Sequence, residues 1–210
     1  MRSTFQEQLS VLSKPKPRKK NGIKDPSPSP MEWIEDGVDH INILRNGKTS
    51  IGDFLAHGAK FPFTHNVFGK FSNMESFWYY IQSTERDDRI RVLTGKHLTS
   101  FKNKLTTQRV KNFRAIIMDS NWQKIKQYKE AVASMRDSEL PFDCYGIDSN
   151  HGIRIRPIYF KWLLSGFEEI RRALKENREP DFTFLIDEKD SGIYDFCINK
   201  REDFRTPESE

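Results

Sequence analysis

The longest amphipathic pattern in the chain runs from Pro157 to about Asn177, and it most limits the folds open to the chain. Its apolar residues recur at helical spacing and form one stripe, made by Trp162, Leu163, Phe167, Ile170 and Leu174. Proline is favoured in the first turn of a helix, and a one-sided apolar stripe is typical of a helix that packs on a core. The sequence therefore predicts its longest helix here.

Shorter patterns surround this helix. Four more helical segments are predicted by periodicity and cap residues, at Ser72–Ser83, at Asp87–Leu93 before a stop at Gly95, at about Gln108–Met118, and at Asn121–Met135 behind Ser120 as cap. Extended segments are predicted at His40–Leu44, at Phe61–Phe71 with a turn at Gly69, at Gly152–Arg156, at Phe182–Ile186 and at Ile193–Ile198. We expect a mainly α fold with minor β (α+β), a single compact helical domain with a small N-terminal β-region.

The chain divides by composition into an arm, a globular part and a tail. Its 210 residues suffice for one sizeable domain and not for two large ones. The segment Lys14–Pro30 mixes Pro, Ser and Lys with hardly any apolar residue, which is typical of a disordered segment. We expect a disordered basic arm at 1–30, a globular domain at 31–200 and a polar tail at 201–210. The arm either contacts nucleic acid or only keeps the protein in solution.

Cysteine and histidine spacing argues against metal and disulfide chemistry. Cys144 and Cys197 lie at no redox or metal-ligand spacing, so neither a disulfide framework nor a zinc finger is predicted. The five histidines also lack ligand spacing: His40, His57, His65, His97 and His151. We expect no metal and no cofactor. The sequence has no apolar run of the roughly 20 residues that span a bilayer and no signal-peptide core, so a soluble, cytoplasmic protein is predicted.

Positive charge is concentrated in the middle of the chain. The segment Arg86–Arg136 holds 13 basic residues and four acidic ones, an excess that attracts polyanions. The predicted nucleic-acid contacts are Arg109, Lys111, Arg114, Lys124 and Lys126. The alternative is a set of solvated helix faces whose acidic neighbours come from elsewhere in the fold.

One carboxylate begins the aromatic helix "SNMESFWYYIQ". Ser72 and Glu75 have the spacing of a capping box, which explains a Glu at this position without any function. Helical spacing places Met74, Phe77, Trp78 and Ile81 on one face, which we expect to be the core side. Glu75, Tyr79 and Gln82 share another face. That face is either the wall of a pocket for a polar ring system or a surface in contact with solvent.

The order of these features resembles the NADAR family, named for NAD and ADP-ribose. The segments "IGDFLAHGAKFPFT" and "FGKFSNMESFWYYI" are similar to the N-terminal signature of that family. The residues that carry the similarity are Leu55, Pro62, Phe63, Gly69 and Glu75. A looser similarity to phage-type members extends the matched region to about Ile41–Leu174. Ala56, His57 and Gly58 stand where the family often has Ser-Asn-Phe, and the late Asp…Trp-Gly element of the family is not visible.

The resemblance implies an N-glycosidase that removes ADP-ribose from modified guanine in DNA or a nucleotide. Phage-type members of the family are similar to proteins that reverse a toxin's modification of DNA, which implies a host-cytoplasmic, anti-defence role. Cleavage builds positive charge on the ribose, and a positioned carboxylate stabilises that charge. Glu75 is the catalytic candidate.

The remaining parts of the ligand suggest further contacts. A flat base stacks on an aromatic ring, and a diphosphate needs cations or backbone amides. The substrate-binding candidates are Trp78, Tyr79, Gln82, Phe54, Gly69, Lys70, Asp143, Tyr145 and Asp148, with Lys96 and Lys102 as further diphosphate candidates. For Asp143, Tyr145 and Asp148, ordinary turn chemistry is an equal explanation. Two functional alternatives stay open: a nucleic-acid or ADP-ribose binding module without turnover, and an accessory or inhibitory interaction protein.

Overall fold

The computed structural model describes residues 36–44, 47–147, 154–155 and 160–186. Several predictions lie outside these residues: the basic arm 1–30, Asp148, Pro157, the extended segment Ile193–Ile198 and the polar tail. No helix within the described ranges is long and apolar enough to cross a membrane.

Helices dominate the described residues, which confirms the predicted mainly α fold with minor β. The α-helices are α2 (Ser50–Leu55), α3 (Met74–Gln82), α4 (Gly95–Lys102), α5 (Phe113–Lys126), α6 (Lys129–Asp137) and α7 (Lys161–Lys175). Two 3-10 helices are η2 (Asp88–Val92) and η4 (Thr183–Leu185). The strands pair two by two: β1 (Ile41–Asn42) lies parallel to β4 (Phe142–Asp143), β2 (Phe63–His65) antiparallel to β3 (Gly69–Phe71), and β5 (Gly146–Ile147) antiparallel to β6 (Arg154–Ile155).

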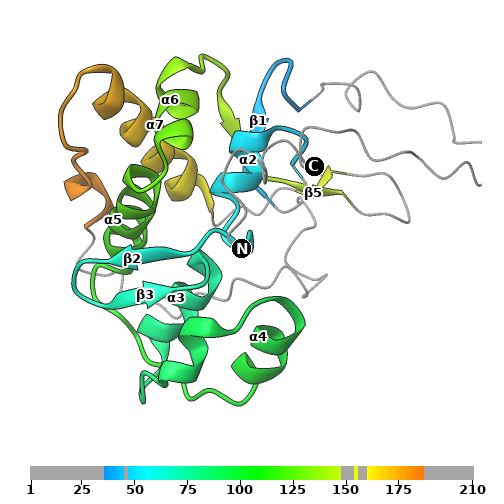
Figure 1. Cartoon of the computed structure of the whole chain (residues 1–210), viewed down its shortest axis with the longest axis vertical. Helices are drawn as coiled ribbons and strands as arrows, with labels where there is room; N and C mark the ends of the chain where they lie inside the picture. The colour runs from blue at the N-terminus through cyan, green and yellow to red at the C-terminus, as the bar shows by residue number, and fades with distance from the viewer. Residues whose placement is uncertain (1–35, 45–46, 148–153, 156–159, 187–210) are drawn as a thin grey trace, which may run out of the picture.

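Helix α5 is the central element of the packing. It contacts α6 and α7 on one side and α3 and the β2 strand on another. Figure 1 shows α5, α6 and α7 grouped together, with the β2–β3 hairpin, α3 and α4 in the lower half of the view. One hydrophobic cluster connects these groups, and it includes residues from β1 through η4.

The crossing of α5 and α7 depends on a glycine. A Cβ atom at Gly166 would lie 2.6 Å from side-chain atoms of Met118, so a larger residue would require the Met118 side chain or the two helices to shift. The apolar stripe predicted for the last helix faces the core, because Phe167 and Ile170 are fully buried. Helix α7 is the longest described helix, as the sequence predicts.

The β2–β3 hairpin also forms where the sequence predicts it. Gly69 has φ +77°, a left-handed conformation that favours glycine. Phe63 and Phe71 are paired across the hairpin, and both rings pack on Phe77 of α3. The hairpin therefore fixes the position of α3 against the core.

The helix boundaries in the middle of the chain differ from the prediction. Helix α5 runs without a break through Ser120, whose buried hydroxyl donates to the Ile116 carbonyl at 2.7 Å. Ser120 is therefore not a helix cap, and the break comes at Gln127–Tyr128 instead. Gly95 begins α4 rather than ending a helix, with φ +55°. The segment predicted as a helix at Asp87–Leu93 is a 3-10 turn.

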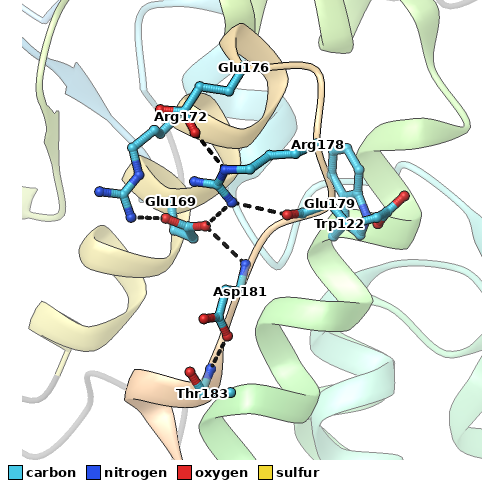
Figure 2. Close-up of polar contacts among 8 residues, drawn as sticks. All are labelled: Trp122, Glu169, Arg172, Glu176, Arg178, Glu179, Asp181 and Thr183. Carbon is cyan, nitrogen blue, oxygen red and sulfur yellow. Dashed lines mark hydrogen bonds and ion pairs between the residues drawn. The ribbon is translucent and has the colours of Figure 1, made fainter.

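The predicted strand Phe182–Ile186 is wrong, because the segment forms η4. A clasp centred on Glu169 of α7 holds the chain just before this turn; we call Glu169, Arg172, Arg178 and Asp181 the Glu169 clasp (Figure 2). Arg178 Nη1 donates to Glu169 Oε1 at 2.6 Å, and the Asp181 amide donates to the same oxygen at 2.9 Å. Arg172 pairs with the other carboxylate oxygen. Asp181 then accepts from the Thr183 amide at 2.9 Å, which turns the chain.

Two further contacts tie the segment after α7 to α5. The Trp122 indole N–H donates to Glu179, and Lys126 lies 3.6 Å from the other Glu179 oxygen.

Burial alone would raise the pKa of Glu169, but the hydrogen bonds from Arg178, the Asp181 amide and Arg172 lower it to about 2. The clasp is thus a set of charges that satisfy one another, and it holds the chain at Asp181, just before η4.

Candidate functional site

Helix α3 buries every one of its nine residues except Glu75, which is partly exposed at its first turn. The predicted core face is confirmed, because Met74, Phe77, Trp78 and Ile81 are all fully or almost fully buried. Glu75 is therefore the one residue of this aromatic helix that is not buried.

The capping box of α3 does not use Glu75. Asn73 is the N-cap, its side-chain oxygen accepts from the Ser76 amide at 2.8 Å, and the Ser76 hydroxyl interacts with the Asn73 amide at 3.4 Å. The predicted Ser72–Glu75 box is wrong by one residue. The Ser72 amide instead donates to the Arg91 carbonyl of η2 at 2.8 Å. Asparagine caps helices as well as serine does, so the local pattern fitted both registers.

The loop between α2 and β2 holds the first turn of α3. The Glu75 amide donates to the His57 carbonyl at 2.8 Å, and the Asn73 side chain donates to the Gly58 carbonyl at 3.3 Å. A Cβ atom on Gly58 would lie 3.2 Å from a Glu75 carboxylate oxygen. Glycine at this position leaves the space that the carboxylate occupies, so the loop and the carboxylate are closely fitted. We call His57, Gly58, Asn73 and Glu75 the α3 amino-terminal site.

A buried polar layer from α5 lies behind this site. The Asn121 amide donates to His57 Nε2 at 3.1 Å. Lys124 is almost fully buried; its ammonium donates to the Phe54 carbonyl of α2 and lies 4.3 Å from the centre of the Phe54 ring. Asn121 and Lys124 are three residues apart on one helix, so they share a face. The sequence analysis missed both as partners of this region, and that spacing was the available signal.

The protonation states of this layer follow from its burial. Burial, and next the charge of Lys124, lower the pKa of His57 to about 3, so His57 is neutral at physiological pH. Burial lowers the pKa of Lys124 to about 7, and the carboxylate of Asp53 partly offsets that effect. His57 therefore adds no positive charge beside Glu75, the one acidic residue of the α3 amino-terminal site.

Two of the predicted stacking rings are core residues. Trp78 has no exposed surface; it stacks on Trp162 with ring centroids 6.0 Å apart and meets the edge of Phe113 at 4.7 Å. Phe54 is also fully buried. The prediction that these rings bind a substrate base is therefore wrong for this structure, because other side chains already cover their faces. Trp122 and Trp162 are buried, as the sequence predicts.

The other two residues predicted on α3 also point inward. Tyr79 is buried, and Lys102 of α4 donates to its hydroxyl at 3.3 Å. Two substrate-binding candidates are thus brought together, at the junction of α3 and α4. Gln82 is buried, and its amide nitrogen donates to the Trp78 carbonyl of the same helix at 3.3 Å. Neither side chain lies on an open face with Glu75.

The remaining substrate-binding candidates lie on two strand pairs. Asp143 ends β4 and accepts from the Cys144 amide at 2.8 Å. Tyr145 is buried; its hydroxyl forms a hydrogen bond with His40 at 2.8 Å, and its amide donates to Asn42 at 3.1 Å. These contacts tie β4 to β1. On the hairpin, Gly69 serves the turn and Lys70 is exposed.

The predicted nucleic-acid residues do not form one surface. Lys124 cannot reach a phosphate, because its ammonium is buried in the layer described above; that prediction is wrong. Lys126 is half-exposed, and it pairs with Glu179 and lies over the Trp122 ring. Arg109 and Lys111 are exposed in the loop before α5, and Arg114 is partly buried.

Among the described residues, no group of three or more His, Cys, Asp or Glu side chains is arranged to hold a metal ion.

Comparisons with known proteins add no assignment. The chain matches no protein-family model, no curated protein and no solved structure. The resemblance to the NADAR family therefore stays a prediction from the sequence.

Proposed function

We propose that the protein is an N-glycosidase that removes ADP-ribose from modified guanine, in DNA or in a nucleotide. One observation carries the proposal: α3 turns all its other side chains inward and keeps Glu75 partly exposed, at the position that the NADAR resemblance assigns to catalysis. The capping alternative no longer accounts for this residue, because Asn73 and Ser76 form the box. A role against a toxin that modifies DNA, as the resemblance implies, is part of the proposal.

The chemistry requires little beyond a fixed carboxylate. The bond between the ribose anomeric carbon and the base nitrogen breaks, the bonding electrons leave with the base, the base nitrogen takes up a proton from solvent, and water adds to the anomeric carbon. Glu75 stabilises the positive charge that develops on the ribose and accepts the proton of the attacking water. The hydrogen bond from its amide to the His57 carbonyl holds the backbone of Glu75, and glycine at position 58 leaves room for the carboxylate.

The test is the Glu75→Gln variant, assayed for ADP-ribose release from ADP-ribosylated guanine in an oligonucleotide and in a nucleotide. Gln keeps the shape and loses the charge, so turnover should fall on the order of 10²-fold or more, with little change in melting temperature. Glu130→Gln is a matched control. Glu130 is likewise the second residue of a nine-residue helix, α6, and is also partly exposed. An active Glu75→Gln enzyme would falsify the catalytic assignment.

Binding without turnover is the second candidate function. The absence from the sequence of the late Asp…Trp-Gly element of the family favours it, since a binding module needs fewer of the family's reaction contacts. The same assay separates the two functions. A binding module releases no ADP-ribose even as the unaltered protein, and Glu75→Gln then changes affinity alone.

A further inference from the structure

A run of 30 residues, 89–118, contains no acidic side chain and eight Lys or Arg. In the structure this run covers most of η2, all of α4, the loop to α5 and the first half of α5. We call residues 86–111 the basic lobe; it includes the lower part of the molecule around α4 in Figure 1. The acids within the lobe are Asp87 and Asp88.

Those two acids are already used by neighbouring arginines. Asp87 pairs with Arg89 at 2.5 Å, and Asp88 pairs with Arg91 at 2.6 Å. Lys102 is bonded to Tyr79. Arg86 is exposed as well, and its guanidinium lies over the Phe68 ring. Apart from these residues, the lobe holds four more exposed cations, none with an ion pair within the described part of the chain; we call them the open cations, and they are Lys96, Lys104, Arg109 and Lys111.

The core holds the backbone that carries the open cations. Ile90 of η2 and Leu98 of α4 are fully buried. The segment after α4 is joined to the end of α3 by two backbone hydrogen bonds. The Thr84 amide donates to the Thr106 carbonyl at 3.0 Å, and the Gln108 amide donates to the Gln82 carbonyl at 2.8 Å. The lobe therefore presents its charges from a fixed frame.

The side chains around the open cations suit phosphate more than protein or lipid. Ser100, Asn103 and Thr106 are exposed, and such groups with Lys and Arg make most contacts to nucleic-acid backbones. The one large hydrophobic residue strongly exposed within the lobe is Val92. A stable protein interface has an apolar centre, and a membrane-binding helix inserts apolar side chains. The lobe offers neither.

We propose that the basic lobe binds the phosphate backbone of nucleic acid through the open cations. This interface shares Arg109 and Lys111 with the one that the sequence suggested, adds Lys96 and Lys104, and leaves out Arg114, Lys124 and Lys126 of α5. The inference does not depend on the glycosidase, because backbone binding requires no chemistry at Glu75. Where both hold, the lobe delivers a modified nucleic acid to the α3 amino-terminal site.

The test compares two variants of the full chain that remove the same charge. The lobe triple is Lys96→Gln, Lys104→Gln and Lys111→Gln. The control triple is Lys60→Gln, Lys129→Gln and Lys161→Gln, three exposed lysines on other elements that also have no ion pair within the described ranges. Fluorescence anisotropy measures binding of a labelled 20-base-pair DNA and its salt dependence. Because every protein keeps the same N-terminal sequence, the contrast between the triples isolates the lobe.

The lobe triple should bind on the order of 10²-fold more weakly than the control triple at about 0.1 M salt. Its plot of log affinity against log salt should be shallower by about 3, since each duplex phosphate contact contributes a slope of about −0.9. Equal loss in both triples, or none in either, overturns the proposal. So does binding to anionic vesicles in place of DNA.

An additional arm keeps this proposal separate from the glycosidase. If the lobe triple loses DNA affinity while release from a free ADP-ribosylated nucleotide is unchanged, the lobe is an interface and not part of the reaction site. If unaltered protein binds DNA through the lobe but releases no ADP-ribose, the glycosidase fails and the lobe stands. If the lobe triple releases ADP-ribose from DNA as fast as the unaltered protein does, the result contradicts only the proposal for the lobe.

Discussion

The Glu169 clasp and the basic lobe are both rich in Arg, yet the clasp pairs its charges internally and the lobe leaves several of its cations without an ion pair in the described part of the chain. In the clasp, one buried carboxylate accepts from Arg172, Arg178 and a backbone amide, and Arg178 also bonds Glu176 at 2.5 Å. In the lobe, the only two acids pair locally with Arg89 and Arg91, and the open cations have no ion pair in the described part of the chain.

The contrast separates charge that stabilises the fold from charge that is available to a ligand. The Glu169 side chain is 2% exposed, so its hydrogen bonds operate in a region from which water is largely excluded. The open cations lie in water, where they contribute little to the fold and repel one another weakly. A polyanion gains most from the second arrangement, because no internal partner has to be displaced.

The largest expected effect comes from removing the centre of the clasp. Glu169→Ala leaves two arginines and the Asp181 amide without their acceptor, and the free energy of unfolding in urea should fall by about 2 to 3 kcal/mol. The value lies at the low end for a broken buried pair because both arginines keep part of their surface in water. Glu176→Gln is the control, with under about 0.5 kcal/mol expected. Equal effects for the two variants would remove the distinction between clasp and lobe.

Lys124 offers a third case, a buried cation that belongs to neither region. Its pKa is about 7 in the fold against an ordinary value of 10.5, so the unfolded chain binds more protons between these values. Stability should therefore rise with pH above 7, by about 2 kcal/mol up to pH 9. Lys124→Met should abolish this rise in denaturant titrations, and Lys126→Met on the exposed side of α5 should retain it. A flat pH profile for the unaltered protein contradicts the assigned pKa.

The pH dependence of stability below pH 4.5 should report on the Glu169 clasp. The pKa of Glu169 is about 2 in the fold and about 4.5 in the unfolded chain, so its contribution is complete above pH 4.5 and disappears as pH falls towards 2. The stability difference between the unaltered protein and Glu169→Gln should narrow by about 1 kcal/mol between pH 4.5 and 3. The lobe triple should show no such narrowing, because its substituted lysines stay protonated throughout this range.

The smallest effect is expected for the lobe itself. The lobe triple should change the free energy of unfolding by less than about 0.5 kcal/mol, with any change a gain that is largest at low salt, since neutralisation relieves repulsion. Melting temperatures at low and high salt measure this. A loss of stability comparable to that of Glu169→Ala would mean that the open cations have structural partners. The distinction between the Glu169 clasp and the basic lobe would then be wrong.

The candidate site was predicted only in part, and the errors have local causes. The sequence identified the carboxylate at the start of α3, but the true capping box is shifted by one residue because Asn73 caps as well as Ser72. It assigned Trp78 to both the core and a stacking role. Only the packing of Trp162 and Phe113 against its ring decides between them.

The sequence by itself determined the elements whose pattern is long or whose turn chemistry is strict. The stripe of α7 repeats over many residues, and the hairpin needs a positive φ at Gly69, so both are where they were expected. The tertiary structure alone decided burial and pairing. Lys124 and Lys126 are both lysines of α5, but Lys124 bonds Phe54 inside the core and Lys126 is half-exposed, because the contacts that α5 makes in the fold set which face of the helix is covered. Periodicity within a single segment cannot contain that information, since the atoms that bury or expose a charge come from parts of the chain far away in sequence.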